Sequence, residues 1–201
     1  MKILKKYLVT ASLLITVCTP ATVMADSDST DTAPFSVQAN LDFQITIPGS
    51  LSFQVGSAGA IDQIDFAPAL ANLGNNTDVA GTGGNVGGGV VDVVLFSNVG
   101  QITITPSNNS SGNGLDNGQG DHIPYTEIIT TSSDDAILPE PALNDAGGIA
   151  VLVPTTAGLG DRVTDLAETW TYTYDNTTVY GEGIYGGSGK GGRVTYTAAA
   201  L

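Results

Sequence analysis

The sequence predicts an all-β fold, and three observations carry that prediction. Short segments in which apolar and polar residues alternate with period two recur from residue 35 to the end of the chain. These segments are rich in β-branched and aromatic residues, which suit a pleated surface. Stretches dense in glycine and asparagine separate them, as turns do. Roughly eight short strands with such turns between them predict a sandwich or a barrel, and we favour the sandwich.

The first alternating segment is the longest. In FSVQANLDFQITI (35–47) every odd-numbered residue is apolar and every even-numbered one is polar or charged. This predicts a strand with one buried and one wet face, about twice the usual length of about 5–6 residues. An apolar edge that projects beyond its neighbours invites pairing with another chain. Residues 43–47 would also serve as the first strand of the domain itself.

Further strands are expected downstream, in the order in which their segments occur. VVDVVLF (90–96) is nearly all apolar, which predicts a central strand or one covered on both faces, joined in a hairpin to QITIT (101–105). ALANL (69–73) could form a single helical turn. The other predicted strands are LSFQV (51–55), the weaker IDQIDF (61–66), HIPYTEIIT (122–130, an edge strand because of Pro124), GIAVLV (148–153), ETWTYTY (168–174) and RVTYTAAAL (193–201).

The amino terminus has the pattern of a secretory signal peptide over residues 1–25. A basic start is followed by an apolar run of about ten residues and by small residues before Asp26. That run is shorter than the about 20 residues that a membrane span needs. An amino-terminal anchor and a lipoprotein cysteine at Cys18 are the alternatives. We therefore expect a secreted protein, with a flexible acidic leader at 26–34 and one sandwich domain at 35–201.

The charge balance limits the partners. Without residues 1–25, three basic residues would stand against twenty acidic ones. Such an acidic surface repels phosphate backbones and anionic lipid, which argues against nucleic acid and against adsorption to membranes. The only cysteine, Cys18, lies in the predicted signal peptide, so we expect no disulfide to hold the fold.

Candidate chemistry is sparse, and we expect no catalytic, cofactor or metal site. His122 is the only histidine, and an exposed loop position explains it more simply than catalysis. Asp134 and Asp135 are adjacent carboxylates, and a glycosidase uses a pair of carboxylates. We interpret them as residues of a solvated turn, because the side chains of consecutive residues point away from each other. A calcium site is the more serious option, because one glycine-rich loop carries the hard oxygen ligands that Ca²⁺ prefers. The alternative interpretation of this loop is an exposed turn. The residues concerned are Asp116, Asn117, Gly118 and Asp121.

Three aromatic residues share one face of the segment 168–174, namely Trp170, Tyr172 and Tyr174. At strand spacing they predict a core face, and a platform for stacking a sugar is the alternative.

The two ends of the chain resemble the pilin subunits of the chaperone–usher type. The resemblance lies in the signal peptide, the Ser/Thr/Asp leader, the alternating segment from Phe35, the Thr- and Val-rich strands and the closing RVTYTAAAL. It implies an incomplete immunoglobulin-like sandwich that lacks its last strand. A periplasmic chaperone fills the groove first, and the extension of a neighbouring subunit, delivered at an outer-membrane usher, replaces it.

Carried onto this sequence, the resemblance implies two sets of residues. The donor strand, residues 35–43, would present Phe35, Val37, Ala39, Leu41 and Phe43. The acceptor groove would be lined by the carboxy-terminal strand through Val194, Tyr196 and Ala198. The chain departs from the family in having no disulfide and in carrying Ala200 where a tyrosine is usual.

We therefore expect a structural subunit of a surface fimbria or of an extracellular matrix fibre, which assembles with identical copies by strand addition. It would have no cofactor, no turnover and no membrane span after export through the periplasm. The alternative is a monomeric secreted binding module that binds a carbohydrate at Trp170 or at the 107–121 loop. The mass in solution distinguishes the two, because the subunit would form oligomers or fibres and the module would stay a monomer.

Overall fold

The computed structural model describes residues 28–156 and 158–201, and the chain divides into two units between Ile47 and Pro48. The predicted signal peptide and the first two residues of the predicted leader lie outside the described residues. All the strands of the described residues belong to the second unit, Pro48–Leu201. We had expected the sandwich to start at Phe35, but its first strand starts at Leu51.

The larger sheet has five antiparallel strands in the order β1–β5–β11–β3, with β9 on the other edge of β11. The long strand β11 pairs with β5 along Thr164–Thr171, and β3 takes the place of β5 beside Thr173 and Tyr174. The bounds are β1 (Leu51–Val55), β3 (Val79–Ala80), β5 (Val90–Ser97), β9 (Ile128–Ser132) and β11 (Thr164–Tyr174).

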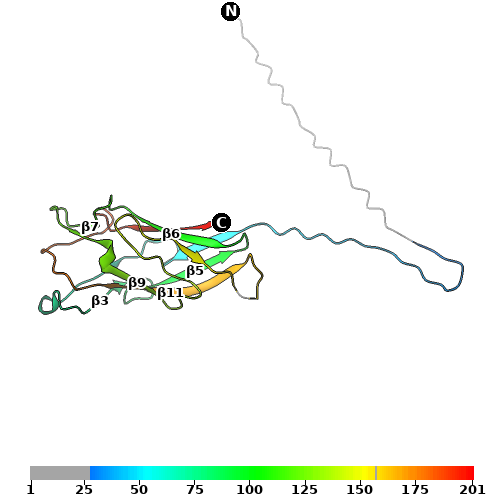
Figure 1. The fold of residues 1–201 in the computed structure, drawn as a ribbon, viewed down its shortest axis with the longest axis horizontal. Helices are drawn as coiled ribbons and strands as arrows, with labels where there is room; N and C mark the ends of the chain where they lie inside the picture. Colours follow the sequence, from blue (N-terminus) through cyan, green and yellow to red (C-terminus); the bar gives the residue numbers. More distant parts are fainter. Residues whose placement is uncertain (1–27, 157) are drawn as a thin grey trace, which may run out of the picture. The chain divides into compact units, whose positions relative to one another are not determined.

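The second sheet has three antiparallel strands in the order β10–β6–β12. It consists of β10 (Val151–Val153), β6 (Ile102–Asn108) and β12 (Val194–Ala200). In Figure 1, β6 lies above β5 and β11, so the two sheets form the layers of a sandwich. The predicted all-β sandwich is confirmed.

Two short strand pairs and two short 3-10 helices complete the domain. The pairs join β2 (Ile64–Asp65) to β4 (Thr82–Gly83) and β7 (Leu115–Asp116) to β8 (His122–Ile123). The 3-10 helices are η1 (Leu70–Asn72), where a single helical turn was expected, and η2 (Tyr125–Glu127).

The core follows directly from the alternation along the central strands. In β5 the odd-numbered valines and Leu95 are buried, while Val94 and Phe96 on the other face are about 40% exposed, at 42% and 38%. A side chain from every second position therefore reaches the space between the sheets. The fully buried apolar side chains include Val93, Leu95, Ile102, Ile104, Leu138, Val153 and Trp170.

Two predictions about the strands of the second unit are wrong, one about pairing and one about continuity. Segments 90–96 and 101–105 both form strands, but no ladder pairs them, because the turn between them carries the chain from one sheet to the other. The expected edge strand 122–130 is broken: Pro124 precedes η2, whose backbone separates β8 from β9. Proline lacks the N–H that a continuous ladder would need.

Residues 35–47, where the alternation predicts a strand, have none assigned to them. The first strand of the domain is β1, which starts after Ser50. Alternation states which face of a segment is apolar, but a strand also needs a neighbouring edge to pair with.

Candidate functional site

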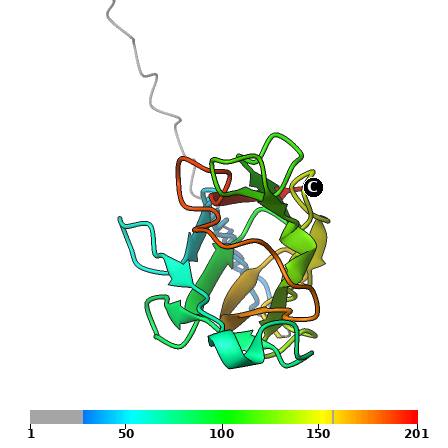
Figure 2. The ribbon, with the colours of Figure 1, turned by 90° about the vertical axis from the view of Figure 1, so that its left-hand side faces the viewer.

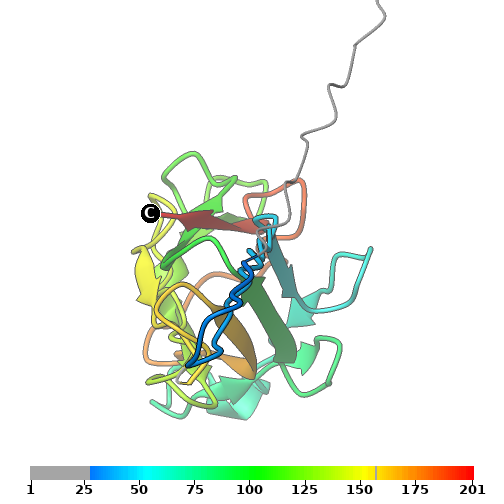
Figure 3. The ribbon, with the colours of Figure 1, turned by 90° about the vertical axis from the view of Figure 1, so that its right-hand side faces the viewer.

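One side of the sandwich is left open between two strand edges. Strand β1 ends the larger sheet, and β12 ends the smaller one. Figures 2 and 3 show these two strands next to each other on the same side of the domain. Among the described residues no ladder joins them, since β1 pairs with β5 and β12 with β6. We call the strip between them the open edge.

The inward side chains of β1 form one wall of the open edge. Leu51, Phe53 and Val55 lie opposite Ser97, Leu95 and Val93 in the ladder, and so face the core. Leu51 is nevertheless 38% exposed, whereas Leu95 and Val93 on the same face of the adjacent strand β5 are fully buried. The sequence shows the alternation in β1, but it does not show that this strand ends a sheet beside β12.

The inward side chains of β12 form the other wall. Val194, Tyr196 and Ala198, predicted as the acceptor-groove residues, do share one face, opposite Asn108, Pro106 and Ile104 of β6. All three pack against the core and remain half-buried. The two walls thus offer apolar surface that no strand among residues 28–156 and 158–201 covers.

Tyr196 ties this wall to the larger sheet. Its ring lies 5.2 Å from the ring of Trp170, tilted by 60°, and its hydroxyl is 2.9 Å from the hydroxyl of Tyr172. The residue as a whole is half-buried, and its hydroxyl end points inward to the buried Tyr172. Burial raises the pKa of Tyr196 well above its ordinary value and raises the pKa of Tyr172 to about 12. Both hydroxyls therefore stay protonated at any physiological pH.

The other side of the sandwich is closed. There the chain between β9 and β10 covers the core with Leu138 and Leu143, which are 0% and 6% exposed. The carbonyl of Leu138 accepts hydrogen bonds from Ser132 Oγ at 2.7 Å and from Trp170 Nε1 at 3.4 Å. The contrast between the two sides makes the open edge the distinctive feature of the domain.

The predicted donor residues lie in the first unit, and their apolar side chains are exposed. Phe35 is 73% exposed, Val37 57%, Leu41 73% and Phe43 87%, and Ala39 is also exposed. The alternation continues to Ile45 and Ile47, which are 86% and 76% exposed. Exposed apolar side chains in this number are unusual, because proteins generally keep contiguous apolar patches small.

The aromatic residues of β11 are a core face. Trp170, Tyr172 and Tyr174 are 0%, 6% and 9% exposed. Trp170 has no exposed surface and the two tyrosines have little, so burial argues against a platform on which a sugar would stack.

The candidate calcium residues are engaged in loop hydrogen bonds. Asn117 Oδ1 accepts from the backbone N–H groups of Gln119 and Asp121 at 2.7 and 3.2 Å. Asp116 Oδ1 accepts from the N–H of Gly118 at 2.7 Å. Lys190 Nζ donates to the carbonyl of Asn117 at 2.9 Å, so an ammonium group already lies against this loop. Over the described residues, no group of three acidic, histidine or cysteine side chains could hold a metal ion.

The residues considered for catalysis are scattered. His122 is exposed in β8 and is paired with Asp116 along the short ladder. Asp134 Oδ1 accepts from the N–H of Ala136 at 3.0 Å, as in a turn. Asp135 instead hydrogen-bonds Glu140, and burial together with this bond raises the pKa of Glu140 to about 7. The sequence did not indicate this pair, because four residues, including Pro139, separate its members.

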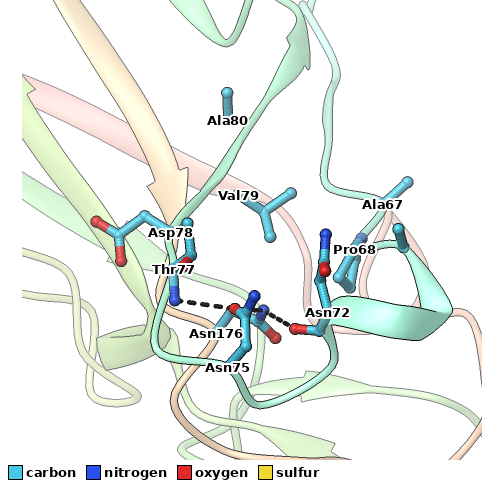
Figure 4. Close-up of a pocket in the computed structure, with 10 residues that line it drawn as sticks. Ala67, Pro68, Asn72, Asn75, Thr77, Asp78, Val79, Ala80 and Asn176 are labelled. Carbon is cyan, nitrogen blue, oxygen red and sulfur yellow. Dashed lines mark hydrogen bonds between the residues drawn. The ribbon is translucent and has the colours of Figure 1, made fainter.

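A small hollow of about 260 Å³ lies between η1, β3 and the end of β11 (Figure 4). Its floor is Asn176, which is 1% exposed and donates through Nδ2 to the carbonyl of Asn72 at 2.6 Å. Asn176 also donates to Asn75 Oδ1 at 3.1 Å and accepts from the N–H of Gly74 at 3.1 Å. Asn176 therefore holds the loop together, and its polar groups are used within the fold.

Comparison with protein-family models and with curated proteins gave no match. In the part of the chain that the structure describes, none of the helices has the length and apolar character that crossing a membrane requires.

Proposed function

We propose that the protein is a secreted structural subunit of a surface fimbria or extracellular matrix fibre, and that identical copies join by β-strand addition. Residues 35–43 of one copy would lie along the open edge of the next. The observation that carries this proposal is that one chain has both a half-covered core edge between β1 and β12 and an exposed segment of alternating apolar residues.

The two edges restrict how such a strand can lie. The start of β1, Leu51, pairs with Ser97, and the end of β12, Ala200, pairs with Ile102. Only residues 98–101 separate Ser97 from Ile102, so β1 starts and β12 ends at the same end of the sandwich. Strands β1 and β12 therefore run in opposite directions. A strand placed between them is parallel to one and antiparallel to the other, and can hydrogen-bond to both.

The side-chain pattern fits the same site. A strand in the open edge turns alternate residues toward the core, and the donor segment has an apolar residue at every second position from Phe35 to Phe43. Full burial of each larger side chain contributes roughly 1.5–3 kcal/mol. Strand addition of this kind takes its affinity from the backbone ladder and its specificity from the alternate side chains.

In this proposal the domain is an immunoglobulin-like sandwich without its last strand. A periplasmic chaperone would cover the open edge before assembly, and an outer-membrane usher would deliver each subunit. Binding between subunits would be the activity, with no turnover.

The test is size-exclusion chromatography with light scattering on residues 26–201 and on a truncation to residues 48–201, which keeps β1 whole. We expect oligomers from the first, a monomer from the second, and a higher melting temperature of the truncation on adding a peptide of residues 33–45. A peptide of the same composition in scrambled order is the matched control. A monomeric 26–201, with a truncation whose melting neither peptide changes, would refute the proposal and favour the monomeric binding module.

A further inference from the structure

Asn98, in the turn that follows β5, binds the chain directly before β1 through three hydrogen bonds. Its Nδ2 donates to the carbonyl of Pro48 at 2.9 Å, and its Oδ1 accepts from the N–H of Ser50 at 2.6 Å. Its backbone N–H donates to the carbonyl of Ser50 at 3.1 Å. Asn98 thus continues the β1–β5 ladder, whose last pair is Leu51 with Ser97, by one further step.

Packing against Val99 restricts the same stretch. A Cβ built on Gly49 would lie 2.8 Å from Cγ1 of Val99, a distance that real Cβ atoms essentially never show. Glycine is therefore the residue that fits between Pro48 and Ser50 while Asn98 holds both of them. We call Asn98 with these three bonds the Asn98 clamp.

The clamp competes with a turn that the same residues favour. Proline followed by glycine suits the two central positions of a type II turn, which here would be Pro48 and Gly49. Such a turn closes when the N–H of Ser50 donates to the carbonyl of Ile47. In the structure that N–H donates to Asn98 Oδ1 instead.

The turn matters because it is the short route by which the segment could reach its own domain. Folded back over Pro48–Gly49, residues 35–47 would lie antiparallel to β1 and fill the open edge from within the same chain. Every copy would then be complete by itself, and none would have a strand to give or an edge to fill.

We propose that Asn98 is a positioning residue that keeps the segment from closing on its own domain, so that a second copy of the chain becomes its partner. The inference rests on the proposed function, since it concerns which copy receives the segment. With the clamp intact, the N–H of Ser50 is occupied, and the open edge is left to a neighbouring chain.

The experiment compares residues 26–201 as wild type, Asn98→Ala and Asn85→Ala by light scattering over a range of concentrations. Asn85 is the matched control, because its side chain likewise makes two hydrogen bonds, but both of them to Asp92 of β5, at 2.6 and 2.9 Å. We expect N98A to need about a tenfold higher concentration than the wild type for half-assembly, as the net loss of about one to two hydrogen bonds implies. N85A should assemble as the wild type does.

A second measurement separates self-closure from misfolding. A self-closed N98A monomer should melt cooperatively, and the 33–45 peptide should leave its melting temperature unchanged, because its own segment fills the open edge. Asn98→Asp keeps the acceptor for Ser50 and loses the donor to Pro48, so it should assemble better than N98A.

If the wild type assembles and N98A assembles equally well, the role of Asn98 is refuted and the proposed function stands. If N98A stays monomeric but the peptide still raises its melting temperature, the segment is not in its own edge, and self-closure is refuted. If the wild type itself does not assemble, the proposed function fails first.

Discussion

Replacing Leu41 by Asp should abolish assembly while leaving the folding of the domain unchanged. Leu41 is 73% exposed and belongs to the first unit, whereas the buried core residues belong to the second. Replacing it therefore removes little of the apolar surface that the unassembled chain buries. In the proposed assembly, by contrast, position 41 would be one of the positions that face the core of the neighbouring copy.

The expected loss can be estimated from that exposure. Full burial of a leucine side chain contributes roughly 1.5–3 kcal/mol, and with 73% of the side chain exposed about three quarters of this remains to be gained on assembly. An aspartate in the same place must also lose its hydration without a partner of opposite charge. Together these effects should weaken each joint by at least about 3 kcal/mol, which is roughly a hundredfold in the dissociation constant.

The assay is light scattering on residues 26–201, with thermal melting as a check of folding. The control is Gln38→Asp, which adds the same charge at an even-numbered position of the same segment. L41D should be monomeric at concentrations at which the wild type and Q38D assemble, and all three should melt alike as monomers. Equal weakening by L41D and Q38D would show that charge rather than burial matters, and normal assembly of L41D would refute strand addition through this face.

Three further predictions concern the domain itself. Tyr172→Phe and Tyr196→Phe should each cost about 1–2 kcal/mol of unfolding free energy, because each leaves the other hydroxyl without its partner at 2.9 Å. The double variant should cost less than the sum, and strict additivity in denaturant melts would contradict the bond. Trp170, the only tryptophan, should fluoresce at short wavelength as a buried indole, and W170A should lose about 3–5 kcal/mol; emission typical of water would contradict its burial. Burial and Asp135 raise the pKa of Glu140 from 4.5 to about 7, so the folded state binds the proton more tightly than the unfolded chain. Its contribution to stability should be complete below about pH 4.5 and lost as pH rises to about 7. Melting of E140Q should lack that decline, and identical pH profiles would refute the shift.

The sequence predicted the central strands well, because alternation reports burial directly. LSFQV became β1 without a change of bounds, and the inward face of β11 carries the three aromatic residues expected there. The face shared by Val194, Tyr196 and Ala198 was also predicted. In each case the residue pattern alone fixes which side chains turn toward the core.

The sequence could not predict which strands share a sheet. Segments 90–96 and 101–105 look like a hairpin, yet they lie in different sheets. A short turn can join two paired strands of one sheet or two strands of different sheets, so the turn alone does not distinguish the two cases. For the same reason the open edge could be predicted only on its β12 side. That β1 is its second wall, and that Asn98 holds Pro48 and Ser50, depends on contacts between residues about fifty positions apart.

The Asn98 clamp has a mechanical consequence for a fibre under tension. Hydrogen bonds between antiparallel strands are perpendicular to the strand axis, so a pull on residue 47 along β1 loads the β1–β5 ladder in shear, with its bonds sharing the force. The bonds of Asn98 to Pro48 and Ser50 come first along that path. In the proposed fibre they would yield before the ladder slips, and this junction would then act as a small extensible joint between subunits.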